Sequence, residues 1–343
     1  MPVRQDKTAV ARVRPVKSGP SCSMDMHTAL AVEDLGSTLA LDRKRPPGYT
    51  VCACEMTFHQ LKEATQLQAT KGNLDTLRKT ARQIRRLVLT AVHSSGAGHT
   101  GGAMSIPEIL SVLYFHTMKI DPDRPLWPER DRFILSKGHA SVGLYAALCL
   151  RGYFGESCMC EFDQIDGRLQ GHPDMLKTPG VDMSTGSLGQ GLSAGLGMAM
   201  GRDRRGLDSW VYVLMGDGEL QEGQVWEAAM YAGFHRIKKL IAIVDYNQLQ
   251  LTGWTKDTLD LEPLDKKWEA FGWKVFSCDG HDVGCLVETM DKAKAVDDGP
   301  VVVIARTMKG RGVSFIEGNV GWHAKAPSDQ ELKRALEELE CGK

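Results

Sequence analysis

Two short apolar runs, at residues 211–215 and 240–244, frame the most regular pattern in the chain. Between them, apolar and small residues recur at steps of three and four, which predicts a helix with one buried face. Continuous apolar runs of this length are typical of strands buried on both sides, as in parallel sheets. The order strand, turn, helix, strand therefore predicts a βαβ unit. The predicted helical face consists of Val225, Ala228, Ala229 and Ala232.

The same patterns occur on both sides of this unit. Helical periodicity predicts helices over 73–95, with Asn73 as the N-cap, over 107–117, and over 328–340, with Ser328 as the N-cap. Short apolar runs predict strands at 132–135 and 300–305. Alternation of strands and helices is typical of α/β proteins. We therefore predict a three-layer α/β sandwich around a mostly parallel sheet.

A segment rich in small residues, 184–201, predicts a further helix that packs closely against another backbone. Glycine weakens a helix by about 1 kcal/mol relative to alanine, so tight packing must compensate. Gly189, Ser193, Gly197 and Met200 are expected on one face, with Ala194 and Gly195 beside them. The glycine-rich entry at 185–187 also suits a close approach to a ligand.

Polar residues follow both strands of the βαβ unit. Gly216-Asp217-Gly218 follows the first strand and Asn247 the second, 247 − 217 = 30 positions later. Open α/β sheets bind ligands at the carboxyl ends of their strands, and oxygen atoms of this kind are ligands for Mg²⁺. The glycines and the following helix N-terminus suit a phosphate. The alternative is that Asp217 only caps the helix.

Four of the ten histidines directly follow a glycine: His99, His139, His172 and His281. Flanking glycines leave an imidazole accessible, which suits hydrogen bonding and proton transfer near neutral pH. A turn residue is the alternative for His99. A metal cluster is the alternative for the group, but no two of these histidines have a ligand spacing such as His-x-x-x-His.

Composition excludes several classes of protein. A net charge of −1 over 343 residues argues against a nucleic-acid partner, and no apolar run approaches the length of a membrane span. Nine scattered cysteines indicate reduced thiols and a soluble cytoplasmic protein. Residues 1–60 lack a core pattern and are predicted to be a disordered extension, and residues 336–343 a tail.

The segment GDGELQEGQVWEAA, followed by Asn247, resembles the thiamine diphosphate (TPP) motif of transketolases. This resemblance implies the TPP-binding fold over residues 61–335. It also implies that Asp217, Asn247 and the backbone carbonyl of Leu249 hold Mg²⁺, or Ca²⁺ or Mn²⁺. Gly218 and Glu219 are then expected to contact the cofactor.

Further motifs resemble those of transketolases in the same order. By this resemblance His99 lies near the reactive carbon, and His139 in SKGHA near the diphosphate and substrate. His172 in GHP lies near the substrate hydroxyl groups, and His323 in the last glycine-rich loop near the diphosphate. These four are the expected catalytic residues. The TGSLGQG segment adds two expected cofactor contacts, Gly186 and Leu188.

Other residues receive weaker or alternative roles. The resemblance places Glu222 and Glu227 at a subunit interface. Lys309 and Arg311 either balance phosphate charge or are ordinary surface residues. His281, in DGHD, matches a recurrent turn and receives no catalytic role.

The resemblance covers only the first third to half of a full-length transketolase. It implies the N-terminal subunit of a split transketolase that needs a C-terminal partner subunit, in an α2β2 heterotetramer. The pair would transfer a two-carbon ketol unit from a ketose phosphate to an aldose phosphate, with the pentose phosphate pathway as the default role. The alternatives are the α subunit of a 2-oxoacid dehydrogenase, a deoxyxylulose phosphate synthase, and a non-catalytic cofactor-binding scaffold.

Overall fold

The computed structural model describes residues 74–342. The predictions made for residues 1–60, the N-cap at Asn73 and the first part of the expected 61–335 domain lie outside the described residues.

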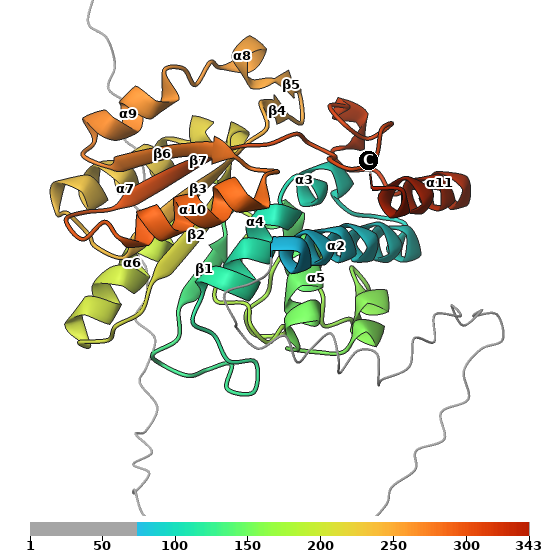
Figure 1. Ribbon diagram of the computed structural model, residues 1–343, viewed down its shortest axis with the longest axis horizontal. Helices are drawn as coiled ribbons and strands as arrows, with labels where there is room; N and C mark the ends of the chain where they lie inside the picture. Colours follow the sequence, from blue (N-terminus) through green and yellow to red (C-terminus); the bar gives the residue numbers. More distant parts are fainter. Residues whose placement is uncertain (1–73, 343) are drawn as a thin grey trace, which may run out of the picture. The chain divides into compact units, whose positions relative to one another are not determined.

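A five-stranded sheet forms the centre of the described part of the chain (Figure 1). The strand order is β1-β2-β3-β7-β6, and every pair is parallel. The four strands predicted from apolar runs are confirmed, whereas β6 was not predicted. A separate two-stranded hairpin, of β4 (Leu249–Gln250) and β5 (Gly253–Trp254), follows β3. The sheet strands are β1 (Arg132–Leu135), β2 (Val211–Gly216), β3 (Leu240–Tyr246), β6 (Lys274–Asp279) and β7 (Val301–Arg306).

Helices cover both faces of this sheet, which confirms the three-layer α/β prediction (Figure 1). Tyr212 and Leu214 of β2 face one buried core, while Val211 and Val213 face the other, as the twofold periodicity of a strand requires. The first core contains residues of α2 (Leu74–Ser95), α4 (Pro107–Val112), α5 (Ser141–Arg151), α10 (Val283–Lys294) and α11 (Asp329–Glu340). The second contains residues of α6 (Gly191–Arg204), α7 (Gly223–Phe234) and α9 (Leu264–Ala270).

Local sequence signals account for several element boundaries. α4 continues into a π-helical turn, η1 (Leu113–Thr117), so the predicted helix over 107–117 is confirmed. Ser328 caps α11 as predicted, and its capping box with Glu331 satisfies backbone donors at the helix start. In α7, the four residues expected on the buried face are all buried.

The prediction for 184–201 is wrong in its start and in its buried face. α6 begins only at Gly191, and residues 184–190 form a loop, so Gly189 is not part of the helix. A Cβ on Gly195 would lie 2.5 Å from Cγ2 of Val213, whereas a Cβ on Gly197 would meet no atom within 4 Å. The close packing expected of this segment is therefore present, but on a different face. The buried residues are Gly191, Leu192, Gly195, Leu196, Ala199 and Arg202.

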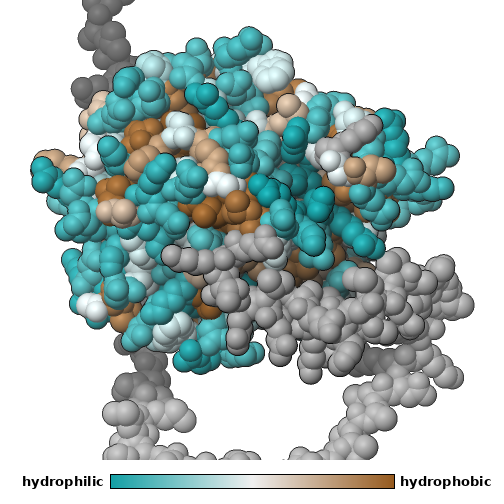
Figure 2. Space-filling view, viewed as in Figure 1, coloured by the Kyte–Doolittle hydropathy of each residue, from teal (hydrophilic) through white to brown (hydrophobic). Residues whose placement is uncertain are grey.

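The parallel arrangement brings the carboxyl ends of β1, β2, β3 and β7 to one edge of the sheet. Figure 2 shows hydrophilic residues over most of the described face in view, with apolar patches between them. Within residues 74–342, no helix combines the length and the apolar character that crossing a membrane requires.

Candidate functional site

Asp217 lies directly after β2 and is 2% exposed. Its carboxylate accepts hydrogen bonds from the backbone N–H groups of Gly218, at 2.7 Å, and Gln248. Burial, reinforced by the nearby Asp245, raises its pKa to about 6. The residue also caps the short 3₁₀ turn η4 (Gly218–Gln221). The long helix expected directly after the GDG segment begins only at Gly223, because this turn intervenes.

Asp245, on β3, organises the edge beside Asp217. It is fully buried and accepts hydrogen bonds from Lys137 Nζ at 2.5 Å, Ser105 Oγ at 2.7 Å and the Thr307 hydroxyl group. Burial alone would raise its pKa, but the Lys137 ammonium and these hydrogen bonds lower it. Asp245 is therefore held ionised at the centre of the edge.

Asn247 is oriented by this carboxylate. Its Nδ2 donates to Asp245 Oδ2 at 2.9 Å, and its Oδ1 accepts the Leu249 N–H at 3.0 Å. The Leu249 carbonyl accepts a hydrogen bond from Lys309 Nζ at 2.8 Å. Lys309 is 3% exposed, so the surface alternative for this residue is wrong. Burial, followed by the proximity of Lys137, lowers the pKa of Lys309 to about 8.

These oxygen atoms fit a hard divalent cation. Asp217, Asn247 and the Leu249 carbonyl are the donor types that Mg²⁺ takes together with phosphate oxygens and water. Asp217 receives no hydrogen bond from a lysine or arginine in the described part of the chain, so its buried charge lacks a direct cationic partner. A positive group, the Lys309 ammonium, already binds the Leu249 carbonyl. Within residues 74–342 no cluster of three or more His, Cys, Asp and Glu residues is placed to hold a metal.

The four histidines that were predicted to be catalytic come together. The ring centroid of His99 lies 5.4 Å from that of His139, 5.9 Å from His172 and 5.4 Å from His323. The rings of His139 and His323 stack at 5.2 Å. The first and last of these residues, His99 and His323, are 323 − 99 = 224 positions apart in the sequence.

Three of these imidazoles are held in the neutral form. Burial lowers the pKa of His99, and it lowers the pKa of His139 well below its ordinary value. Burial and the nearby Lys309 together lower the pKa of His323 to about 3. Lys309 Nζ lies 2.7 Å from His323 Nδ1. Because the ammonium group can only donate, Nδ1 accepts and the proton of His323 lies on Nε2. Neutral imidazoles of this kind can bind hydroxyl groups and move protons.

The glycine-rich loop borders this cluster. Gly186 has a φ of +155°, and a Cβ there would lie 3.1 Å from Cδ2 of His172, so a side chain would crowd the histidine. Leu188 is 37% exposed. Glu219 is buried and accepts hydrogen bonds from Ser136 Oγ, Gly189 N at 2.9 Å and Gly216 N at 3.0 Å, and burial raises its pKa. It thus ties the loop to the ends of β1 and β2.

Glu222 and Glu227 are exposed, at the start and on the outer face of α7, and the Cβ of Glu222 packs against Gly189 of the glycine-rich loop. Three apolar side chains near the end of the same helix, Met230, Tyr231 and Phe234, are also exposed. The interface role of the two glutamates remains a prediction.

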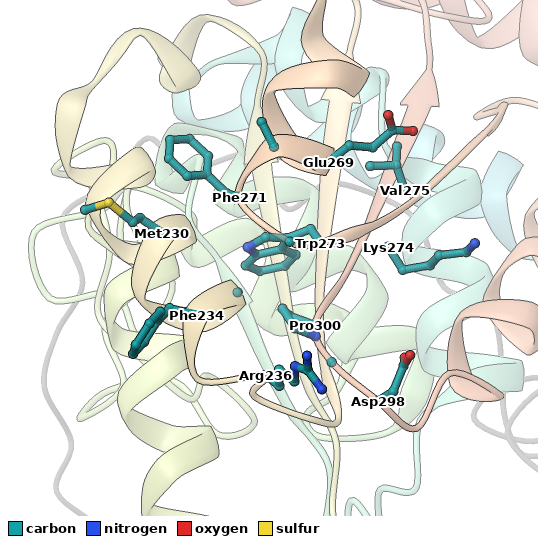
Figure 3. Close-up of a pocket in the computed structure, with 14 residues that line it drawn as sticks. Met230, Phe234, Arg236, Glu269, Phe271, Trp273, Lys274, Val275, Asp298 and Pro300 are labelled. Atoms are coloured by element: carbon teal, nitrogen blue, oxygen red, sulfur yellow. The ribbon is translucent and has the colours of Figure 1, made fainter.

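Two hollows lie at opposite edges of the sheet. One of about 1030 Å³ is lined by Phe234 of α7, Trp273, Lys274 at the start of β6, and Pro300 before β7 (Figure 3). This is the amino-terminal edge, and no predicted site residue lines the hollow. A smaller hollow of about 310 Å³ lies at the carboxyl edge, beside Asn247 and Thr307.

The fold and this edge define an α/β protein of the parallel-sheet class, with its candidate ligand site at the carboxyl ends of the strands. Residues 76–341 match the family model described as transketolase, thiamine diphosphate binding domain. The chain therefore belongs to the transketolase family, as the domain that binds TPP.

Separate transketolase subunits are similar to this chain over nearly their whole length. The 6-deoxy-6-sulfo-D-fructose transketolase subunit SqwG of Clostridium sp. (strain MSTE9) is 47% identical over 264 residues, covering 77% of this chain and 96% of that protein. An apulose-4-phosphate transketolase subunit of Actinobacillus succinogenes is also 47% identical, over 266 residues, with the same coverage. These similarities favour the transketolase prediction over the 2-oxoacid dehydrogenase alternative.

Full-length transketolases are matched only in part. Human transketolase is 38% identical over 267 residues, covering 78% of this chain but 42% of that protein. The crystal structure of transketolase from Campylobacter jejuni aligns with a TM-score of 0.75 at 33% identity, covering 78% of this chain and 43% of that one. The chain thus spans less than half the length of these proteins. The predicted TPP-binding fold is confirmed.

Some residues at the site are not among those predicted from the sequence. Lys137 was present in the SKGHA motif, but nothing in the sequence showed that it pairs with Asp245, 108 positions away. Asp245 itself lies two residues before Asn247, and period two would place both on one side of the strand end. This alternation is the sequence signal that could have identified Asp245. No sequence signal pointed to Ser105 or Thr307.

Proposed function

We propose that this chain is the N-terminal subunit of a two-chain transketolase, active with a C-terminal partner subunit. The observation that carries the proposal is the edge where Asp217, Asn247 and the Leu249 carbonyl lie together, in a chain that matches separate transketolase subunits along nearly their whole length. The reaction would transfer a two-carbon ketol unit from a ketose phosphate to an aldose phosphate.

Asp217, Asn247 and the Leu249 carbonyl would hold Mg²⁺, or Ca²⁺ or Mn²⁺, bound to the cofactor diphosphate. Gly218 would contact the diphosphate through its backbone, and the Lys309 ammonium group would balance the phosphate charge. Gly186 and Leu188 would contact the cofactor from the glycine-rich loop. Glu219, whose oxygens already accept three hydrogen bonds, would act by holding that loop.

TPP supplies the electron sink that lets a carbon–carbon bond beside a carbonyl group break and form. His99, His139, His172 and His323 would bind substrate hydroxyl groups and carry protons. The lowered pKa values of His99, His139 and His323 support this role, because a neutral imidazole can both accept and donate at pH 7.

The partner subunit would supply the groups that transketolases carry in their second domain. We propose an α2β2 heterotetramer, with Glu222 and Glu227 at a subunit interface. Their exposure on α7, next to exposed Met230 and Phe234, suits a surface that is covered in an assembly. We also propose that the assembly is cytoplasmic.

The substrates are proposed as sugar phosphates or similarly charged sugars. One relative is named for a sulfonated fructose and another for apulose 4-phosphate, so a pentose phosphate substrate is one member of the class to be tested. A non-catalytic scaffold is the second candidate. The intact set of Asp217, Asn247 and four clustered histidines favours an enzyme over it.

The deciding experiment combines binding with turnover. The chain, alone and mixed with a candidate C-terminal transketolase subunit, is titrated with TPP and Mg²⁺, and ketol transfer is followed with xylulose 5-phosphate, apulose 4-phosphate and sulfofructose donors. Turnover only in the mixture, lost in Asp217→Ala, is expected. TPP binding without turnover on any donor would favour the scaffold, and no TPP binding in any mixture would refute the proposal.

A further inference from the structure

A buried network of three polar side chains contacts the backbone of the loop that carries Lys309. Arg85 on α2 donates to both carboxylate oxygens of Glu108 on α4, at 2.6 Å and 2.7 Å. His281, in the turn between β6 and α10, contacts the same carboxylate, with Nδ1 3.1 Å from Oε2. Arg85 is 4% exposed and Glu108 8% exposed, so their charges are balanced within the protein rather than by water.

The hydrogen bonds of His281 fix where its proton lies. The backbone N–H of Met308 points at Nε2 of His281, at 2.8 Å. An N–H group only donates, so Nε2 must accept, and the proton of the neutral ring lies on Nδ1, facing Glu108. Although burial alone raises the pKa of Glu108, Arg85 and His281 lower it to about 2. The carboxylate is therefore ionised and accepts from both partners.

The network holds the backbone on both sides of Lys309. His281 accepts the N–H of Met308, the preceding residue. Arg85 Nε donates to the carbonyl of Arg311, two residues later, at 2.7 Å. A single carboxylate, Glu108, thus orients two of the groups that hold the loop, in addition to backbone hydrogen bonds such as that from Gly310 N–H to the Gly101 carbonyl. A lysine side chain is long and flexible, so the placement of its ammonium group depends on a fixed backbone.

We propose that the Arg85–Glu108–His281 network positions Lys309 for the cofactor diphosphate, with His281 as the positioning residue. This inference rests on the proposed function. In the present structure Lys309 Nζ reaches both the Leu249 carbonyl and His323 Nδ1, at 2.8 Å and 2.7 Å. None of the three network residues contacts the metal donors; their effect is exerted through the loop backbone.

Matched variants separate hydrogen bonding from packing. His281→Leu retains bulk and removes both hydrogen bonds, whereas His281→Gln retains one donor and one acceptor in a single amide group. His116→Leu is the control, because the His116 side chain is 12% exposed against 13% for His281, and it also faces a carboxylate, that of Asp291 at 3.5 Å. His116 lies on η1, away from the 307–312 loop in the sequence.

Two measurements on the full chain test the proposal: hydrogen exchange of the peptide over 307–312 without ligand, and titration with TPP and Mg²⁺. His281→Leu is expected to exchange faster there, because both hydrogen bonds of His281 are lost, and to bind TPP about tenfold more weakly, a change of about 1.4 kcal/mol. His281→Gln should bind TPP within about threefold of wild type, and His116→Leu should match wild type in both measurements.

The outcomes distinguish the two proposals. Unchanged exchange and TPP affinity in His281→Leu would overturn the positioning role, as would equal weakening in His116→Leu or a Gln variant as weak as the Leu variant. A wild-type chain that binds no TPP, alone or with a partner subunit, would instead refute the proposed function. In that case exchange over 307–312 would still decide whether His281 holds the loop.

Discussion

Replacing Asp217 by asparagine should stabilise the metal-free chain at pH 7. The side chain is 2% exposed, and its pKa of about 6 lies well above the ordinary value of 3.8. At about 1.36 kcal/mol for each pKa unit, ionising this carboxyl group opposes folding by about 3 kcal/mol. Asparagine has only one side-chain oxygen, so either the Gly218 or the Gln248 N–H is left facing the NH2 group of the amide, which costs about 1–3 kcal/mol. The expected net gain is therefore at most about 2 kcal/mol.

The same shift fixes the direction of the pH dependence. The unfolded chain loses the Asp217 proton near pH 3.8, while the folded chain keeps it until about pH 6. Between these values the folded state binds more protons, so its free energy of unfolding falls as the pH rises through this window. In Asp217→Asn this contribution is absent, and the advantage of the variant should grow from about pH 4 to about pH 6 and then stay constant.

Urea unfolding, followed by tryptophan fluorescence at several pH values in EDTA, measures this difference. The control is Asp298→Asn, because that carboxyl group is exposed and its replacement removes the same charge. Adding Mg²⁺ and TPP should stabilise wild type and the control but not Asp217→Asn, since ligand binding to the folded state adds to its stability. A variant that is less stable than wild type above pH 6 without metal would refute the electrostatic argument.

Four further substitutions have expected outcomes. Lys309→Met should raise the melting temperature of the ligand-free chain, because the lysine pKa of about 8 shows that its buried charge opposes folding, and it should weaken TPP binding in a titration. Lys137→Met should lower the unfolding free energy by about 3–5 kcal/mol in urea, since Asp245 is left unpaired at 0% exposure. Gly195→Ala should cost about 1–3 kcal/mol by overpacking, whereas Gly197→Ala, in open space, should gain up to about 1 kcal/mol in the same assay.

The strands of the central sheet could be predicted where burial on both faces gave continuous apolar runs. β2 and β3 are such strands, and every residue of 211–215 and 240–244 is buried. β6 could not be predicted in this way, because it is an edge strand in which only Cys278 is fully buried. The start of α6 was placed too early because residues 184–190 have helix-like spacing but contain Gly186 and Gly189 at positive φ.

The site was predictable where residues follow strands, and not where it depends on pairing between distant segments. Asp217 and Asn247 could be found because adjacent parallel strands place their carboxyl ends together. The clustering of four histidines could be expected from the family resemblance alone. The burial of Lys309, and its contacts with Leu249 and His323, depend on how the loop after β7 folds back over the edge, which local sequence does not encode.

The buried charges at this edge should lower the stability of the ligand-free chain. Asp217 and Glu219 have raised pKa values and Lys309 a lowered one, so each of these charges opposes folding, while Asp245 is stabilised by Lys137. On the proposed function, a divalent cation would pair with Asp217 and a diphosphate with Lys309, removing both penalties at once. Binding would then be more favourable because it removes the cost of these buried charges. Mutations that replace the charged side chains by neutral ones should therefore stabilise the ligand-free fold and weaken cofactor binding together.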